Sequence, residues 1–359
     1  MTESILHQDI PSVEASRLER IRRLVWKMAI ATLILMAIGS ATRVMNAGLA
    51  CPDWPLCYGQ LVPTQQMNLQ VFLEWFHRLD ASAIGIGAIA LTGLSWWDRQ
   101  FLPRWLPWAA SFALFLIVFQ GILGGLTVTE LLRFDIVTAH LGTALIFFIT
   151  LLAIAASLTP LPSHGSSGKI LPAIALTAAI LVYLQSLLGG LVGSQWALHQ
   201  CFSYSELCAV MNSHIIGVVP ATLATVSVVF VAWRNQSLLP IIKQLAWLAG
   251  ILLLVQIGLG IATFYLHLQV EPLTVAHHTV GASLVGCLVV LTVFSLKIGN
   301  REQGIGNREQ GTGNREQGIG NREQGTGNKD GRSKFPVFLF ILNFDTPRII
   351  SGLTQHLYW

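Results

Sequence analysis

Eight long apolar stretches dominate this 359-residue chain and restrict what it can fold into. A helix needs about 20 apolar residues to cross the hydrocarbon core of a bilayer. Only 11% of the residues are charged, against about 25% in soluble domains. The sequence therefore predicts an all-α membrane protein in contact with lipid, with eight transmembrane helices and no nucleic-acid partner. The stretches cover roughly residues 24–45, 73–97, 105–128, 134–157, 169–193, 211–233, 241–266 and 272–297.

Basic residues are concentrated on one predicted side of the membrane. They lie before the first stretch, and then in every second connection, at 99–104, Lys169 and 234–243. The positive-inside rule therefore predicts that both termini are cytoplasmic. The first stretch lacks a small-residue cleavage site, so we interpret it as a retained helix rather than a signal peptide.

Matched intervals indicate a duplicated four-helix unit. Gly39 precedes Cys51 by 12 residues, and Gly189 precedes Cys201 by the same number. Because four is an even number, the two copies keep one orientation, and a pseudo-two-fold axis along the membrane normal relates them. The predicted parts are a cytoplasmic lead (1–23), a first four-helix bundle (24–158), a second four-helix bundle (159–298) and a C-terminal tail (299–359).

The tail has a different composition from the bundles. Residues 299–328 repeat a glycine-rich, polar unit of seven residues without an apolar face. Such a segment cannot bury a core. We predict a disordered cytoplasmic tail and assign it no function.

Four histidines recur at matched positions. His140 follows His77 by 63 residues, and His277 follows His214 by 63 residues. Each lies near the start of an even-numbered stretch, so all four share one membrane depth and can face one another in pairs. A lone histidine in a membrane helix is usually a packing residue, but four matched ones point to function. Zinc prefers three or four clustered ligands, whereas haem iron takes two axial imidazoles. The spacing predicts two bis-histidine haem sites.

Other histidines compete less well as ligands. His278 is the alternative to His277, but it lies about 100° further round the helix, and the 63-residue interval favours His277. The remaining five lie in tails or loops, where solvated side chains are expected: His7, His164, His199, His267 and His356.

The two copies differ beside the first histidine of each pair. Glu74 precedes His77 by one helical turn and lies on the same face, while His214 has no such acid. A carboxylate there can accept protons or stabilise positive charge; an interfacial, solvated glutamate is the alternative. Arg78 either pairs with a haem propionate or anchors the helix end. The copy with Glu74 is the candidate reaction site, and the other is the candidate electron-carrying site.

Four of the five cysteines lie in two connections on the predicted outer face. An oxidising face favours disulfides, with free thiols as the alternative. The turn-rich segment from Cys51 to Cys57 favours the first pairing. A Cys201–Cys208 pairing is also predicted, over seven positions instead of six. Cys287, inside the last stretch, is interpreted as core packing.

Together these residues resemble the haem A synthase family over about residues 20–298. The resemblance rests on the Glu74-x-x-His77-Arg78 motif, the Cys51-Pro-Asp-Trp-Pro-Leu-Cys57 loop, and the ordered histidines that follow. It implies an enzyme that oxidises the C8 methyl group of haem O to a formyl group through successive hydroxylations, giving haem A.

The resemblance also implies roles for the residues. Substrate haem O lies between His77 and His140 with Glu74 next to the methyl group, and a permanent haem b lies between His214 and His277. The implied location is a bacterial inner membrane. Haem O synthase and cytochrome oxidase assembly factors are the implied partners, and homo-oligomerisation is left open.

Two further functions fit parts of the sequence. A dihaem cytochrome b electron carrier explains the four histidines but gives Glu74 no role in one copy only. A transporter with 4+4 repeats would use the histidines as proton relays, but it requires broken helices near the midplane, which the sequence does not suggest.

Overall fold

The computed structural model describes residues 3–162, 165–193 and 206–320. In this part of the chain, eight helices are long and apolar enough to cross a membrane, and they agree with the eight predicted stretches. Their bounds are α1 (Glu3–Val44), α2 (Leu69–Trp97), α3 (Leu106–Thr129), α4 (Phe134–Leu158), α5 (Leu171–Val192), α7 (Glu206–Arg234), α8 (Pro240–Tyr265) and α9 (Glu271–Gly320).

Local signals explain several helix starts. The side chain of Asn68 accepts a hydrogen bond from the Val71 backbone N–H at 2.9 Å and so caps the start of α2. Helices α3, α5 and α8 carry a proline in their first turn, where the missing N–H costs no intrahelical hydrogen bond. Short connections then make consecutive helices antiparallel.

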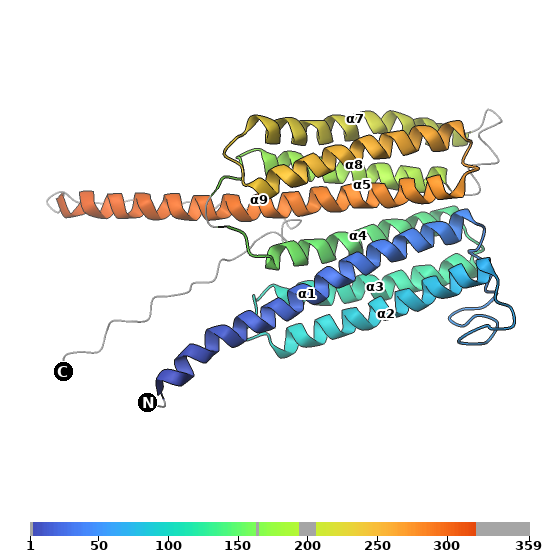
Figure 1. Cartoon of the computed structure of the whole chain (residues 1–359), viewed down its shortest axis with the longest axis horizontal. Helices are drawn as coiled ribbons and strands as arrows, with labels where there is room; N and C mark the ends of the chain where they lie inside the picture. Colours follow the sequence, from blue (N-terminus) through green and yellow to red (C-terminus); the bar gives the residue numbers. More distant parts are fainter. Residues whose placement is uncertain (1–2, 163–164, 194–205, 321–359) are drawn as a thin grey trace.

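The helices form two groups of four (Figure 1). In the first group α1, α2, α3 and α4 contact one another in a closed ring, and α5, α7, α8 and α9 repeat that ring in the second. The groups meet through α1 with α9, α4 with α9, and α4 with α5. This is the arrangement expected of tandem bundles, and the pseudo-two-fold axis stays a prediction.

The interface between the bundles is built around α4 and α9, which are the most buried spans. Gly286 of α9 permits this contact, because a Cβ there would lie 2.8 Å from Leu152 and 2.9 Å from Phe148 of α4. Small residues allow this close approach of helices in a membrane. Lys297 of α9 donates to the backbone carbonyls of Ser157 and Thr159 at 2.6 and 2.7 Å. Apolar packing thus joins the bundles, and the Lys297 hydrogen bonds add polar contacts at this end of the interface.

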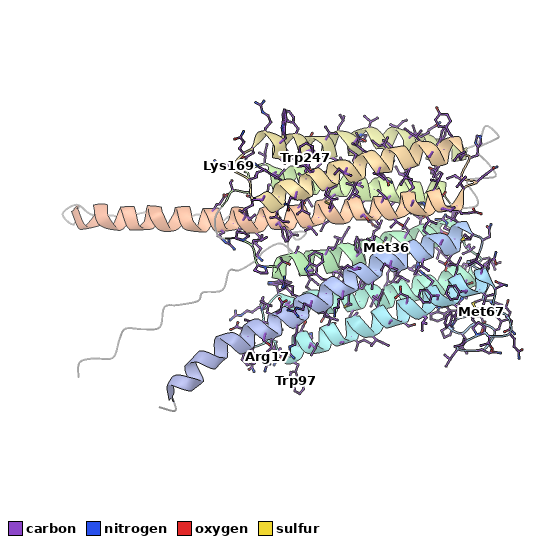
Figure 2. All side chains as sticks on the ribbon, viewed as in Figure 1. Arg17, Met36, Met67, Trp97, Lys169 and Trp247 are labelled. Atoms are coloured by element: carbon purple, nitrogen blue, oxygen red, sulfur yellow. A yellow bond between two sulfur atoms is a disulfide. The ribbon has the colours of Figure 1, made fainter. Side chains whose placement is uncertain are left out.

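The two ends of the molecule differ. Met67 lies at the end that carries the Cys51–Cys57 loop, whereas Arg17, Trp97 and Lys169 lie toward the other (Figure 2). Arg17 forms an ion pair with Asp98 at that second end. We call the first end the loop end. The four matched histidines lie near the loop end, because α2, α4, α7 and α9 all begin there.

Helix α9 continues beyond the predicted span as far as Gly320. Residues 299–320 continue this helix in the structure, and the disorder that the sequence predicts for the tail stays a prediction. A helix that is already nucleated gains a hydrogen bond for each added residue, so it can extend without a packing partner. The rest of the expected disordered tail, residues 321–359, lies outside the described residues.

Candidate functional site

Each of the four matched histidines packs against a glycine of the preceding membrane helix. A Cβ would lie 2.7 Å from the His77 ring if added at Gly39, and 3.3 Å from the His140 ring if added at Gly124. In the second bundle, the corresponding distances are 3.0 Å from Gly189 to His214 and 3.0 Å from Gly260 to His277. Each glycine thus leaves the space that its imidazole fills.

The imidazole rings face these glycines in a consistent way. At all four positions, Cε1 is the ring atom nearest to the glycine and Nδ1 is the next. The Cε1 edge of each ring, between the two nitrogens, therefore faces the glycine. The Nδ1 atoms of His77, His140 and His277 are buried and have no hydrogen-bond partner in the structure.

The structure brings the second predicted pair together. The ring centroids of His214 and His277 are 6.4 Å apart, with 79° between the ring planes. His77 of α2 and His140 of α4 pack on α1 and α3 of the first bundle. An ion bound between two imidazoles, with bonds of about 2 Å each and ring half-widths of about 1 Å, requires centroids about 6 Å apart. The second pair is thus spaced to hold one metal ion between its rings.

Glutamine side chains orient the histidines of three helices. Each lies four residues before the glycine that contacts the ring: Gln120, Gln185 and Gln256. Gln120 donates to the backbone carbonyl of His140 at 2.9 Å, and Gln185 donates to that of His214 at 2.6 Å. Gln185 Nε2 also lies 2.9 Å from His214 Nδ1, and Gln256 Nε2 lies 3.3 Å from His277 Nε2.

His278 faces a different neighbour from His277. Its Nδ1 lies 2.7 Å from Ser40 Oγ of α1, at the interface between the bundles. Of this adjacent pair, His277 is the one whose ring packs on Gly260 and faces His214. The geometry therefore favours His277 as the ligand, in agreement with the sequence interval.

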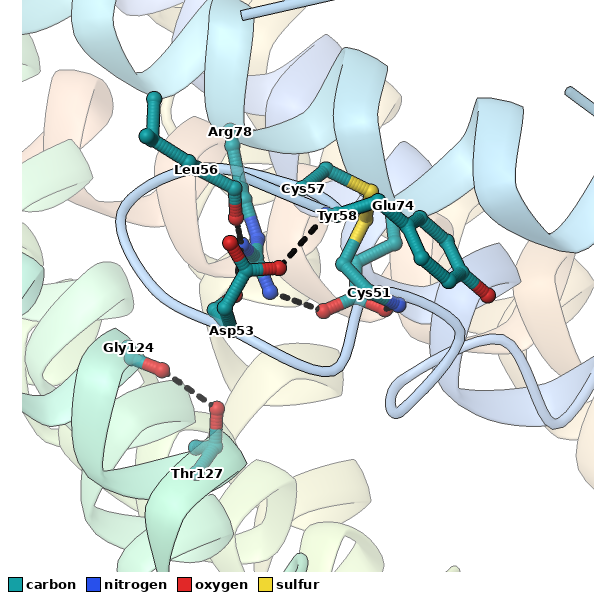
Figure 3. A network of polar contacts seen from close by, with 9 residues as sticks. All are labelled: Cys51, Asp53, Leu56, Cys57, Tyr58, Glu74, Arg78, Gly124 and Thr127. Atoms are coloured by element: carbon teal, nitrogen blue, oxygen red, sulfur yellow. Dashed lines mark hydrogen bonds and ion pairs between the residues drawn. A yellow bond between two sulfur atoms is a disulfide. The ribbon is translucent and has the colours of Figure 1, made fainter. Parts of the chain in front are cut away.

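Glu74 is buried, and its carboxylate is engaged in polar contacts (Figure 3). One oxygen accepts from the backbone N–H of Cys51 at 2.8 Å, and the other pairs with Arg78. Arg78 also donates to the backbone carbonyls of Asp53 and Leu56. The solvated alternative for Glu74 is wrong. One Arg78 amino group thus holds the loop, and the other holds the Glu74 carboxylate.

The loop beside this ion pair is closed by the predicted Cys51–Cys57 disulfide. Asp53 accepts from the backbone N–H groups of Tyr58 and Gly59 at 2.6 and 2.7 Å. The Trp54 indole lies 3.3 Å from where a Cβ at Gly125 of α3 would be. The loop therefore reaches from α2 to α3 across the loop end of the first bundle.

The other predicted cysteine and histidine positions have separate outcomes. Cys287 is buried with a free thiol, as expected for core packing. Cys201 lies outside the described residues, so its pairing with Cys208 stays a prediction. His267 is exposed, as expected, while the other four predicted solvated histidines lie outside the residues or side chains that the structure describes.

The donor set fits haem better than a clustered metal site. Among the described residues, no three His, Cys, Asp or Glu side chains form a group that could hold a metal ion. Two facing imidazoles on apolar helices are a donor set that haem iron takes as axial ligands. The four imidazoles are only partly buried, so the surrounding side chains do not close over them.

Sequence reasoning missed the glycine contacts and a polar contact between the bundles. In the sequence, Gly39 and Gly189 were interpreted only as markers of the repeat. The signal that could have identified the glycine contacts is a fixed register, in which glutamine precedes three of the four glycines by four residues. The polar contact is that of Arg43, which donates to the carbonyl of Gly190 at 3.1 Å, and the charge distribution of the sequence does not indicate it.

Comparison with known proteins agrees with this geometry. The family model described as cytochrome oxidase assembly protein, COX15-CtaA, matches residues 22–289. The heme A synthase of Shewanella oneidensis is 28% identical over 324 aligned residues, which cover 76% of this chain and 96% of that protein. The heme A synthase of Exiguobacterium sibiricum is 32% identical over 126 residues, covering 33% of this chain and 40% of that protein. The chain therefore belongs to the COX15-CtaA family of cytochrome oxidase assembly proteins.

Proposed function

We propose that this chain is a membrane oxidoreductase that converts haem O into haem A for cytochrome oxidase. Family membership and relatives named heme A synthase support the reaction. The observation that carries the proposal is the asymmetry between the bundles. Two histidine pairs recur, but in the sequence an acid and an arginine, Glu74 and Arg78, flank only the first histidine of the first pair.

The first bundle is the proposed reaction site. His77 and His140 would hold the iron of substrate haem O and so fix the porphyrin near Glu74. Converting the methyl group to a formyl group oxidises the reacting carbon, so it needs an oxidant from outside this chain to take the electrons, and a positioned carboxylate can accept the protons that are released. In the described structure, Arg78 keeps the Glu74 carboxylate oriented. The loop that Glu74 holds lies over the same end of the bundle and limits the access of water.

The second bundle is the proposed cofactor site. His214 and His277 would hold a permanent haem b, which supplies reversible one-electron chemistry when bound. Gln185 binds the backbone and lies beside the ring of His214, so it restricts how that imidazole turns. Such outer contacts orient metal ligands and tune the metal.

The proposed location is a bacterial inner membrane with both termini in the cytoplasm. The loop end would then face the oxidising side, where the Cys51–Cys57 disulfide is stable. Basic residues such as Arg17 and Lys169 lie toward the opposite end (Figure 2), in keeping with the positive-inside rule. Haem O synthase and oxidase assembly factors are the proposed partners, and a homo-oligomer stays a prediction.

Pigment analysis of the purified protein tests the function. Expression with a haem O supply should yield a protein with a haem absorption band and should accumulate haem A in the membrane. Haem that stays unmodified would identify a dihaem electron carrier instead. A colourless purified protein would contradict both haem functions and favour the transporter.

A further inference from the structure

Three polar side chains meet between the bundles, close to the histidine pairs. They are Ser40 and Arg43 of α1 and His278 of α9, and we call them the polar junction. Ser40 Oγ lies 2.7 Å from His278 Nδ1. Arg43 donates to the Gly190 carbonyl of α5 at 3.1 Å. The junction therefore links α1 of the first bundle with both α5 and α9 of the second.

The residues of the polar junction are next in sequence to residues that form or support the histidine pairs. Ser40 follows Gly39, on which His77 packs, and His278 follows His277. The Arg43 acceptor, Gly190, follows Gly189, on which His214 packs. A shift of the junction would thus move the supports of three of the four imidazoles.

The corresponding position on the other side of the interface is apolar. Gly190 occupies the place in α5 that Ser40 occupies in α1, and Leu141 follows His140 as His278 follows His277. A Cβ at Gly190 would lie 2.5 Å from Leu141 Cδ2, so this glycine and leucine pack tightly. An apolar pair is therefore sufficient for bundle contact. Polar groups within a membrane are costly and usually functional, so the polar junction needs another explanation.

Arg43 brings an uncompensated positive charge to the second bundle. Among the side chains that the structure describes, it forms no ion pair with a carboxylate; its recorded partner is the Gly190 carbonyl. In a low-dielectric interior a fixed charge acts strongly over several ångströms. A positive charge beside a haem stabilises the reduced iron relative to the more positive oxidised iron.

We propose that the polar junction raises the reduction potential of a haem bound between His214 and His277. Arg43 supplies the charge, and His278 is a positioning residue that fixes His277 through its contact with Ser40. The inference rests on the proposed cofactor site in the second bundle. This effect gives a reason for joining the bundles in one chain, because a charge on the first bundle sets the reduction potential of the haem in the second.

A redox titration of the purified, haem-loaded full chain, followed by its absorption spectrum, tests the charge. Arg43→Gln should lower the midpoint potential of the second-bundle haem, and Arg43→Lys should keep it near the wild-type value. Arg133→Gln is the matched control, since Arg133 is an exposed cation at the loop end that pairs with Glu130 and Asp135. It should leave the potential unchanged.

The outcomes separate clearly. An Arg43→Gln midpoint equal to that of Arg133→Gln would overturn the proposal. If Arg43→Gln does not retain haem, Arg43→Lys decides, because a wild-type potential supports the charge effect and a lowered one contradicts it. Haem conversion is measured separately, so a protein that binds haem without making haem A contradicts the proposed function and still reports the potential.

A second variant tests the positioning role. Ser40→Gly combined with His278→Leu copies the Gly190–Leu141 pair, which the fold already accommodates, so the protein should still bind haem. Its low-spin electron paramagnetic resonance signal should shift, because His277 has lost its fixed orientation. His278→Gln alone keeps a group able to hydrogen-bond Ser40, so its signal should be closer to that of the wild type than the signal of the double variant. A wild-type signal from the double variant would exclude positioning by His278.

Discussion

The backbone of Gly260 lies directly against the ring of His277, so that a Cβ at this glycine would come within 3.0 Å of the ring carbon Cε1. Two residues earlier on the same helix, Gly258 has nothing within 4 Å of the corresponding point. One glycine of α8 is thus needed for the position of an imidazole, and its neighbour is not. This contrast provides a test with an internal control.

Gly260→Ala should weaken haem binding in the second bundle by about 10–100-fold, the range seen when outer contacts of a metal ligand are lost. The added methyl group would displace His277 or push α8 away from α9. Gly258→Ala should bind haem normally and should stabilise the helix by about 0.5–1 kcal/mol. Haem titration of the apoprotein measures both, and equal affinities would show that the glycine contact is unimportant.

Replacing His214 by alanine should remove the permanent haem. Haem loss in His214→Ala should be larger than in Gly260→Ala, because His214→Ala removes a proposed ligand, whereas Gly260→Ala only displaces one. His77→Ala should leave that haem in place, because His77 belongs to the first bundle. Haem-to-protein ratios after purification measure the difference. Full haem occupancy in His214→Ala would reverse the assignment of the two bundles.

Glu74→Gln should abolish haem oxidation while leaving the second-bundle haem spectrum unchanged. The amide oxygen can still accept from the Cys51 N–H, but it carries no charge and cannot take up a proton as a carboxylate does. Extracted pigments should contain haem O or its alcohol instead of haem A. Normal yields of haem A would remove Glu74 from the mechanism.

Glu74→Ala should in addition destabilise the loop end. Removing one partner of a buried ion pair costs about 3–5 kcal/mol, and Arg78 would lose its carboxylate. The loop from Cys51 to Cys57 should then become more susceptible to proteolysis than in Glu74→Gln. Limited proteolysis of both variants makes the comparison, and identical cleavage would mean that the ion pair does not hold the loop.

Replacing both Cys51 and Cys57 by serine should impair the first bundle alone. Loss of a disulfide typically costs about 2–4 kcal/mol, and here the cost falls on the loop that Glu74 and Arg78 hold. Haem O oxidation should decrease while the second-bundle haem keeps its spectrum. Cys287→Ala serves as the control, since its thiol is buried and unpaired. A changed second-bundle spectrum in the serine variant would contradict independent roles for the bundles.

Much of the fold and of the candidate site could be predicted from the sequence. The eight spans follow from hydropathy and length alone, because only a helix satisfies every backbone polar group within a bilayer. The Cys51–Cys57 disulfide followed from a short, turn-rich loop, while the choice of His277 over His278 as a ligand, made from a repeated interval, stays a prediction. The extension of α9 into the repeats as far as Gly320 could not be predicted, since composition does not record that a helix precedes the repeats.

Tertiary structure decided how these residues contact one another. Glu74 and Arg78 are one helical turn apart in any helix, but only the folded loop brings the Cys51 N–H and the Asp53 carbonyl to them. Likewise, Ser40 and His278 are 238 positions apart, and no local pattern links them. Hydropathy and periodicity report which face of a helix is apolar. Rotation and tilt depend on how small and large side chains of neighbouring helices fit together, and this fit determines which polar atoms meet.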